Sequence, residues 1–408
     1  MPLTRRQVYF RRRLAVVGGG LVALATAFYL PLTLLAPVQE VAAQVEAFET
    51  RAVVQPALTF PEYGASAIGA VGYAGVLASG GSADALPIAS ISKVITALVI
   101  LDAKPLAVGE PGPDIAFGDA DVALYDAQVA QNGSVAPVYA GQVLTQRDAM
   151  NVMLIVSANN YAESLANWAF GSQEAFVEAA KVWLAGAGLP STAIVEPTGV
   201  SPSNISTSTD LVELGRIALS HPVLAEIVGT PSIDIPELGT IENTNSLLGI
   251  TGIDGIKTGT LDEAGSCLLF SQDYVVGDTT VTLVGVVLGG PDRPTINAAV
   301  QSLLAQADAG FQSVTLVEQG QRLATYDTEW GDESAAVAAS TLSVVVWSAT
   351  PITAASSPED VQLAEAGTDI GTLSFTVGNR TLDVPLELSS TIDDPGPWWR
   401  LTHPLELF

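Results

Sequence analysis

The stretch Ser90-Ile-Ser-Lys93-Val-Ile-Thr-Ala-Leu-Val-Ile-Leu101 places a serine and a lysine three residues apart at the start of an apolar run without glycine or proline. Its apolar residues recur at helical spacing, which predicts a helix with Ser90 at its start. Because residues three apart on a helix share one face, the Ser90 hydroxyl and the Lys93 amine can meet within hydrogen-bonding reach. As a free amine, the lysine can then accept the proton of the serine.

Two further motifs follow at a distance, Ser157-Ala-Asn159 and Lys257-Thr-Gly259. The chain has four lysines, at 93, 104, 181 and 257, and two of them fall in the motifs that require one. Residues 147–156 predict a helix that ends at the second motif. The apolar runs 267–271 and 281–288 after the third predict adjacent antiparallel strands. Each motif alone is common, but this order on these elements indicates a serine nucleophile activated by lysine.

The residue types suit a division of catalytic roles. Burial and a second cation, Lys257, would lower the pKa of Lys93 and free its amine. Ser157 can pass a proton between Lys93 and a leaving amine, and the Asn159 amide can hold Lys93 and the peptide carbonyl of a substrate.

The third motif suits substrate binding. Lys257 suits a carboxylate, Thr258 adds a hydroxyl, and Gly259 lets a substrate backbone approach the strand. An oxyanion would lie between the backbone N–H groups of Ser90 and Thr260.

Composition excludes several other classes of protein. The chain of 408 residues has 16 basic and 43 acidic residues and a net charge of -27, which disfavours nucleic-acid binding. The lone Cys267 cannot form an intramolecular disulfide, and only His221 and His403 are histidines. We therefore expect neither a histidine-rich metal site nor a histidine-based triad.

The N-terminus predicts a membrane helix. Residues Leu14 to Val38 are uncharged and long enough to cross a bilayer, and five arginines precede them. That charge bias keeps the N-terminus in the cytoplasm and places the rest of the chain outside. Val41-Ala-Ala43 is an acceptable cleavage site, so a secreted form is the alternative to the uncleaved anchor that we favour.

The rest of the sequence predicts a catalytic part followed by strands. Residues 104–140 are rich in Gly, Pro and Asp and predict a segment dominated by loops, whereas 172–187, 210–220 and 295–309 predict helices. Residues 342–347, 371–377 and 380–386 predict strands, with a hairpin turn at Gly378-Asn379. The expected domains are 1–38 (cytoplasmic start and membrane helix), 39–58 (connector), 59–313 (catalytic domain), 314–396 (β-domain) and 397–408 (a Trp-containing tail).

The chain resembles the low-molecular-mass penicillin-binding proteins of the serine D-alanyl-D-alanine carboxypeptidase family. The resemblance is strong over residues 60–310 and weaker over 315–392. The stretches that carry it are Pro87-Ile-Ala-Ser-Ile-Ser-Lys-Val-Ile-Thr-Ala-Leu-Val99, Gly171-Ser-Gln-Glu-Ala-Phe-Val177, Asn243-Thr-Asn-Ser-Leu-Leu248 and Ile253-Asp-Gly-Ile-Lys-Thr-Gly-Thr-Leu-Asp-Glu-Ala-Gly265.

This resemblance implies an α/β (α+β) transpeptidase-like fold, in which helices flank a sheet and form a helical subdomain, followed by a small all-β domain. It also implies an acyl-enzyme at Ser90 made from the terminal D-Ala-D-Ala of peptidoglycan stem pentapeptides. β-Lactams would acylate the same serine and so inhibit the enzyme. The family needs no metal or organic cofactor.

Some residues depart from the family pattern and leave alternatives open. Ala158 and Asn160 stand where the family usually has Gly and Asp. A DD-endopeptidase would use the same catalytic residues. A β-lactamase needs an added carboxylate to activate the deacylating water. The class that uses a glutamate carries it in a Glu-x-x-Leu-Asn loop, which Glu196-Pro-Thr-Gly199 does not match. An inactive wall-binding scaffold is the alternative outside enzymes. In the tail, Trp398-Trp399 either caps the β-domain, as we favour, or contacts lipid headgroups.

Overall fold

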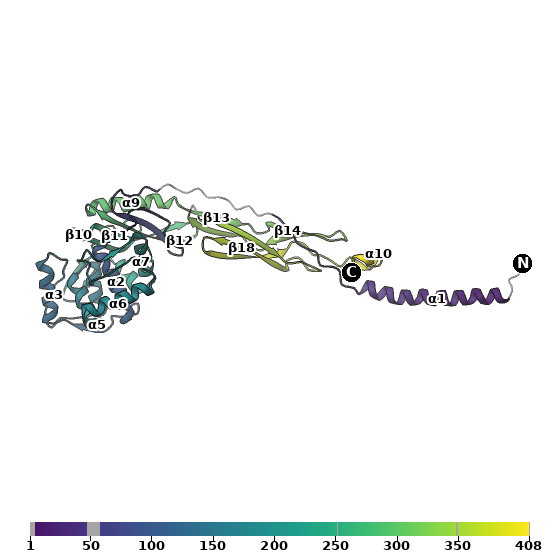
Figure 1. The fold of residues 1–408 in the computed structure, drawn as a ribbon, viewed down its shortest axis with the longest axis horizontal. Helices are drawn as coiled ribbons and strands as arrows, with labels where there is room; N and C mark the ends of the chain where they lie inside the picture. Colours follow the sequence, from purple (N-terminus) through teal and green to yellow (C-terminus); the bar gives the residue numbers. More distant parts are fainter. Residues whose placement is uncertain (1–4, 47–57, 251, 348–349, 408) are drawn as a thin grey trace. The chain divides into compact units, whose positions relative to one another are not determined.

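The computed structural model describes residues 5–46, 58–250, 252–347 and 350–407. Their contacts divide the chain into two compact units, whose elements are labelled in Figure 1. The larger unit is drawn from residues 54–313 and 345–349. The smaller unit is drawn from residues 1–53, 314–344 and 350–408, so it includes the beginning and the end of the chain.

The centre of the larger unit is an antiparallel five-stranded sheet. Its strand order is β10 (Ile253–Leu261), β11 (Gly265–Val276), β12 (Thr279–Gly290), β2 (Ala65–Ala70) and β3 (Ala78–Gly81). The predicted antiparallel pairing of 267–271 with 281–288 is confirmed, because both runs lie in the neighbouring strands β11 and β12. The strand that carries the third motif, β10, lies at one edge of the sheet.

Helices cover both faces of this sheet, as Figure 1 shows for α7 (Ser208–Ser220) and α9 (Arg293–Asp308). Side chains alternate along β11, so Leu269 enters one core while Leu268 and Phe270 enter the other. We call the first the α7 core and the second the α9 core. This layered arrangement is the expected α/β fold.

A group of helices packs on the α7 side. These helices are α2 (Ser92–Ala103), α3 (Asp119–Ala130), α4 (Gln146–Ile155), α5 (Asn159–Phe170), α6 (Gln173–Gly186) and α8 (Pro222–Val228). The central one, α2, is buried continuously from Ser92 to Leu101, as expected for a helix that is apolar on every side. Short two-stranded ribbons connect the helices: β4 (Leu86–Pro87) with β7 (Ile205–Ser206), β5 (Asp114–Ala116) with β6 (Val143–Thr145), and β8 (Ser232–Ile235) with β9 (Gly239–Glu242).

Two of these helices differ from the sequence-based expectation. Residues 104–140, expected to be dominated by loops, do lie mostly outside helices and strands, but they also contain α3 and β5, which the sequence did not predict. The glycines and prolines of this segment lie on either side of α3, and Asp121 accepts a hydrogen bond from Gly118 N at 2.8 Å at the helix start. α5 was not foreseen, because Asn159 and Asn160 belong to a residue type that favours caps and turns over helix interiors.

The smaller unit is built on an antiparallel six-stranded sheet. Its order is β1 (Gln44–Val45), β14 (Arg322–Asp327), β15 (Glu333–Ala338), β19 (Arg380–Leu388), β18 (Asp369–Val377) and β17 (Ile352–Pro358). A separate ribbon pairs β13 (Phe311–Val317) with β16 (Leu342–Trp347). The predicted Gly378-Asn379 turn is confirmed, since Val377 lies opposite Arg380 and Gly378 has a φ of 61°.

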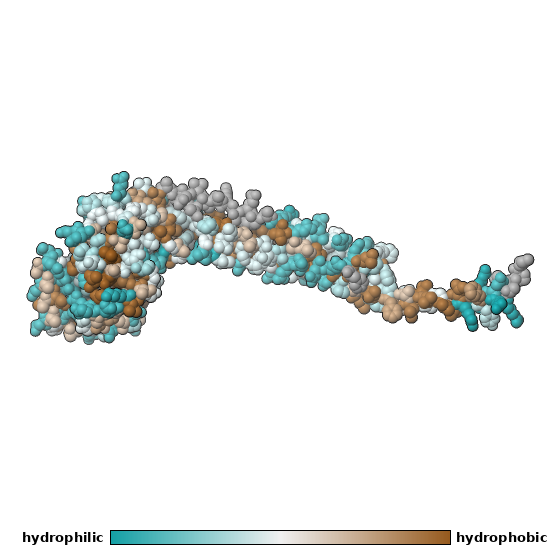
Figure 2. All heavy atoms as spheres, viewed as in Figure 1, coloured by the Kyte–Doolittle hydropathy of each residue, from teal (hydrophilic) through white to brown (hydrophobic). Residues whose placement is uncertain are grey.

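The first helix, α1 (Arg5–Leu34), is the one helix among the described residues that is long and apolar enough to cross a membrane. Figure 2 shows hydrophobic residues along most of it and hydrophilic ones at its start. The helix ends before Val38, the expected limit of the span. Instead, Ala36 and Val38 are buried in a small cluster with Leu407, against Trp330 and Trp399.

The tail forms two short helical turns, α10 (Gly396–Thr402) and η2 (Pro404–Glu406). Its two tryptophans have different environments. The Trp399 ring lies 5.7 Å from that of Trp330 and stacks on His403, so it caps the smaller unit. Trp398 is 78% exposed.

Replacing Gly285 by alanine should destabilise the larger unit by about 1–3 kcal/mol. Phe270 lies opposite Gly285, and an added Cβ would lie 2.3 Å from the Phe270 ring, which would have to leave its position. Phe270→Ala should cost about 3–5 kcal/mol because it leaves a cavity in the α9 core. Urea unfolding measures both, and Thr280→Ala at an exposed position of β12 is the control. A Gly285→Ala protein as stable as the wild type would contradict this packing.

Candidate active site

Ser90 lies in η1 (Ala89–Ile91), a 3₁₀ turn that leads directly into α2. Ala89 has a φ of 46°, a left-handed conformation that is rare outside glycine. Two glycines allow other segments to approach this turn. A Cβ on Gly199 would lie 1.9 Å from Ala89 O, and a Cβ on Gly259 would lie 3.2 Å from Ser90 N. The backbone around the serine is therefore enclosed by the third motif and by the loop that contains Gly199.

Lys93 is fully buried on α2 and has three polar neighbours. Its Nζ lies 3.0 Å from Ser90 Oγ, 2.7 Å from Asn159 Oδ1 and 2.7 Å from the Thr198 carbonyl oxygen. Asn159 Oδ1 and the Thr198 carbonyl oxygen can only accept hydrogen bonds. In the free-amine form, the two hydrogens of Lys93 serve these acceptors, and its lone pair faces the Ser90 hydroxyl.

Burial lowers the pKa of Lys93 to about 7, while the charges of Glu196 and Glu163 act in the opposite direction. A large fraction of the amine is therefore free near neutral pH. Lys257, expected to contribute to this lowering, is itself affected: burial, Lys93 and Arg293 lower its pKa well below the usual value.

The second motif lies between α4 and α5. Asn159 accepts from Lys93 through Oδ1, and its Nδ2 donates to Gln128 Oε1 at 2.9 Å. Ser157 is buried, with a φ of 64°. Among the residues that the structure describes, Lys93 bonds to Ser90, Asn159 and Thr198 and not to Ser157.

The third motif runs along the edge strand β10, against which η1 packs. Lys257 is buried and donates to its neighbour's carbonyl, Thr258 O, at 3.1 Å. The Thr258 hydroxyl lies 2.8 Å from the Thr244 hydroxyl. Thr260 is exposed at the end of this row. The motif thus presents buried and exposed polar groups beside Ser90.

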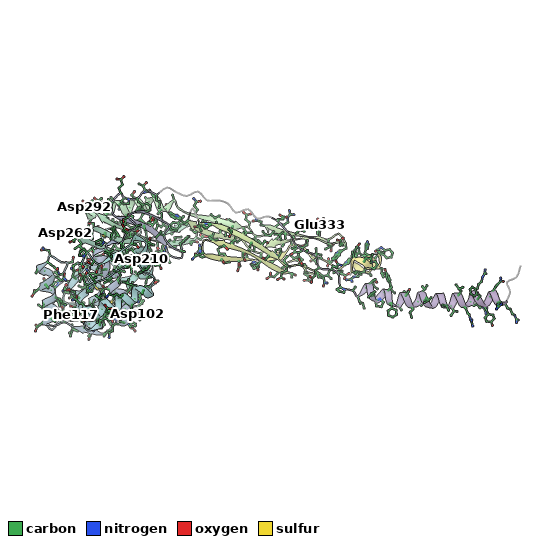
Figure 3. All side chains as sticks on the ribbon, in the orientation of Figure 1. Asp102, Phe117, Asp210, Asp262, Asp292 and Glu333 are labelled. Atoms are coloured by element: carbon green, nitrogen blue, oxygen red, sulfur yellow. The ribbon has the colours of Figure 1, made fainter. Side chains whose placement is uncertain are left out.

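Arg293 adds a charge that the sequence motifs do not include. Its Nε lies 3.4 Å from Thr260 Oγ1, and its Nη1 donates to Thr244 O at 3.1 Å. The preceding residue, Asp292, labelled in Figure 3, caps α9 by accepting from Thr295 N at 2.8 Å. The start of α9 therefore holds a guanidinium beside the third motif.

The loop that follows α6 supplies Thr198, and Glu196 organises it. The Glu196 carboxylate accepts hydrogen bonds from Thr198 N at 2.6 Å, Gly199 N at 2.7 Å and Asn204 Nδ2 at 2.9 Å. These bonds hold the Thr198 carbonyl against Lys93. The sequence reading missed Thr198 and Gln128 as contributors to the site. The Glu-Pro-Thr-Gly sequence, in which a carboxylate precedes a turn whose N–H groups it can bind, is a signal for Thr198, whereas Gln128 has no such signal.

The comparisons with known proteins agree with this geometry. The model of the peptidase S11 family, described as D-alanyl-D-alanine carboxypeptidase, matches residues 67–291, more than half of the chain. The chain belongs to this family.

The chain is 35% identical over 192 residues to a D-alanyl-D-alanine endopeptidase of Pseudomonas aeruginosa, covering 45% of this chain and 58% of that protein. It is 26% identical over 342 residues to the D-alanyl-D-alanine carboxypeptidase DacC of Escherichia coli, covering 80% and 83%. The matches to the two endopeptidases of P. aeruginosa and E. coli span about three fifths of those proteins. Penicillin binding protein 5 of Haemophilus influenzae has the same fold, with a TM-score of 0.59 at 19% identity over 84% of this chain and 100% of that one.

Acylation of Ser90 should rise with pH through about 7, because the free amine of Lys93 accumulates as the pH passes its pKa. Below that value the rate should fall by about tenfold per pH unit. The rate of labelling by a fluorescent penicillin between pH 5 and 9 measures this. Lys181→Met, which removes an exposed lysine of α6, should leave the profile unchanged. A rate that is flat or falls between pH 5 and 8 would exclude Lys93 as the base.

Proposed function

We propose that the chain is a serine D-Ala-D-Ala carboxypeptidase, which removes the terminal D-alanine from peptidoglycan stem pentapeptides. One observation carries the proposal: the Lys93 amine has fixed acceptors for two hydrogens, and Ser90 Oγ lies 3.0 Å from Lys93 Nζ, where it faces the lone pair of the free amine. A lysine held in this way is a general base aimed at a serine nucleophile. The family of the chain supplies the class of substrate.

Acylation begins when Ser90 Oγ attacks the carbonyl carbon of the penultimate D-alanine and its proton passes to Lys93. The oxyanion is received by the N–H groups of Ser90 and Thr260. The proton then passes from Lys93, through the Ser157 hydroxyl, to the leaving amine. The C–N bond breaks, terminal D-alanine departs, and an ester to Ser90 remains.

Deacylation uses the same groups in reverse. Lys93, again a free amine, takes a proton from a water molecule that adds to the ester carbonyl. When the ester bond breaks, that proton returns to Ser90 Oγ and the shortened peptide leaves. A β-lactam would acylate Ser90 through the first half of this cycle and remain bound if water attacks its ester slowly.

Substrate binding follows from the edge strand. An extended peptide can add to the edge of β10 by backbone hydrogen bonds. Its terminal carboxylate would then lie at Lys257, at the guanidinium of Arg293 and at the hydroxyls of Thr258 and Thr260. Gly259 keeps this path clear, because a side chain there would reach Ala89 and Ser90.

A DD-endopeptidase that cuts cross-links is the second candidate. The observation that favours it is that two relatives with 35% and 31% identity are endopeptidases. A β-lactamase is disfavoured because the Glu196 carboxylate bonds within its own loop, to Thr198, Gly199 and Asn204. An inactive scaffold is disfavoured because Ser90, Lys93 and Asn159 form a connected hydrogen-bonded group.

Ser90→Ala should abolish the release of D-alanine from a stem pentapeptide and labelling by fluorescent penicillin, because it removes the nucleophile. The fold should remain, because Ser90 is not the capping residue of η1 or α2 and its hydroxyl bonds to Lys93. Free D-alanine is measured for wild type and variant, and a cross-linked muropeptide dimer is assayed in parallel. Cleavage of the dimer alone would favour the endopeptidase. A wild type that neither labels nor cleaves would refute both.

We also propose that α1 stays attached and anchors the chain, with the residues that follow α1 outside the cytoplasmic membrane. The residues beyond α1 are built into the smaller unit: Val41 exchanges backbone hydrogen bonds of 2.8 and 3.1 Å with Val361. Glu46 pairs with Arg322 at 2.7 Å. Tyr29 of α1 donates to Leu401 O at 2.7 Å. Cleavage near residue 43 would detach the Val41 pairing and the buried Ala36 and Val38 from this unit.

Full-length protein should therefore remain in the membrane after a carbonate wash, and its N-terminal sequence should begin before residue 36. A variant that lacks residues 2–34 should be soluble when expressed without export, because it keeps the strand and the cluster but not the apolar helix. Fractionation with N-terminal sequencing tests this. A mature N-terminus at Gln44 would contradict the anchor.

A further inference from the structure

We propose that Gln128 and Glu163 set the direction of the hydrogen bonds that aim the Lys93 lone pair at Ser90. The inference rests on the proposed function, in which Lys93 is the base. Neither residue belongs to the three motifs, and neither bonds to Ser90 or to Lys93 among the described residues. Both are positioning residues that act through Asn159.

The orientation of the Asn159 amide decides where the Lys93 lone pair points. With its oxygen toward Lys93, the amide takes one amine hydrogen, and Thr198 O takes the other. With the amide rotated by half a turn, its NH₂ group would face the amine. Lys93 would then accept a bond from Asn159 and would have no lone pair for the serine proton.

Gln128 holds the Asn159 amide with its oxygen toward Lys93. It lies on α3, is 2% exposed, and accepts a hydrogen bond from Asn159 Nδ2 at 2.9 Å. Gly133 is packed against both amides: a Cβ there would lie 2.5 Å from Gln128 Oε1 and 2.8 Å from Asn159 Nδ2. Gln128 is itself an amide with two orientations, however, so something beyond it must fix its direction.

Glu163 provides that direction. It lies on α5 four residues after Asn159, hence on the same face of the helix, and its carboxylate faces the side-chain amides of Gln128 and Gln173. An ionised carboxylate can only accept hydrogen bonds. Gln128 must therefore turn its NH₂ group to Glu163 and its oxygen to Asn159. Because the Glu163 carboxylate accepts at the end of the series, each hydrogen bond from Lys93 through Asn159 and Gln128 is donated toward Glu163.

The charges around the site are consistent with this role. Burial raises the pKa of Glu163, while hydrogen bonding from the two glutamines and the charge of Lys93 lower it. Its Oε2 atom is buried without a hydrogen-bond partner in the part of the chain that the structure describes. Glu196 from its loop and Lys257 from β10 are the other charged groups beside Lys93.

The test compares Glu163→Gln, Gln128→Leu and the double variant with wild type in the full-length protein. Glu163→Gln keeps the shape but can present a donor or an acceptor, so it removes the fixed direction. Glu178→Gln, the same change at an exposed position of α6, is the matched control. The readouts are the labelling rate with fluorescent penicillin between pH 5 and 9, and kcat and KM for D-alanine release. Circular dichroism confirms that each variant is folded.

Each single variant should lower the labelling rate and kcat by roughly 10- to 100-fold with KM unchanged, the range expected for a misaligned base. In Glu163→Gln the midpoint of the pH profile should also move to lower pH, because a carboxylate that raises the Lys93 pKa is lost. The double variant should be no slower than the slower single variant, since both act through one series of bonds.

Wild-type rates and an unchanged pH midpoint in folded Glu163→Gln would overturn the inference while leaving the proposed function intact. Equal losses in the Glu178→Gln control would do the same, because the effect would not depend on position. A wild type that does not label would instead overturn the proposed function, and this inference with it.

Discussion

The burial of one lysine is the constraint on which the site depends. Lys93 lies within a helix that is buried along most of its length, and its burial is tolerated because its amine has hydrogen-bond partners from three separate segments.

The pKa of Lys93, about 7, also makes the stability of the fold depend on pH. Between about pH 7 and 10 the unfolded chain binds a proton at this lysine that the folded chain does not, so this group adds stability as the pH rises. The same burial that creates the base therefore makes the protein less stable in mild acid.

Sequence reasoning succeeded where the evidence is local. The spacing of Ser90 and Lys93, the apolar runs of β11 and β12, and the Gly378-Asn379 turn each depend on neighbours within a few residues. It failed where the evidence is distant. The Lys93 contact with Thr198 joins residues 105 apart in the chain, and the Asn159 contact with Gln128 joins residues 31 apart. Helix α3 was missed because its flanking glycines and prolines dominated the composition of the segment, and Gln128 was missed with it.

Backbone conformation was also beyond the reach of the sequence. Ala89 and Ser157 both have positive φ, and neither is a glycine or an asparagine that would signal it. Such conformations cost of order 1–3 kcal/mol each and persist only where the surroundings enforce them. Packing around each residue holds these conformations. Gly199 and Gly259 lie against the backbone of Ala89 and Ser90, and Ser157 lies in the short turn between α4 and α5. Both distortions occur next to or within catalytic motifs, so the local strain serves the placement of the two serines.

The smaller unit joins residues from opposite ends of the chain, with Ala36 and Val38 packed beside Leu407 and β1 paired with β14. Its first strand is made more than 270 residues before its second, as the pairing of Gln44 with Thr325 shows. During synthesis the larger unit is complete long before the last residues that close this cluster emerge. The N-terminal segment must therefore wait, unpaired, until these later residues have been synthesised, and it becomes fully packed only once Leu407 is in place.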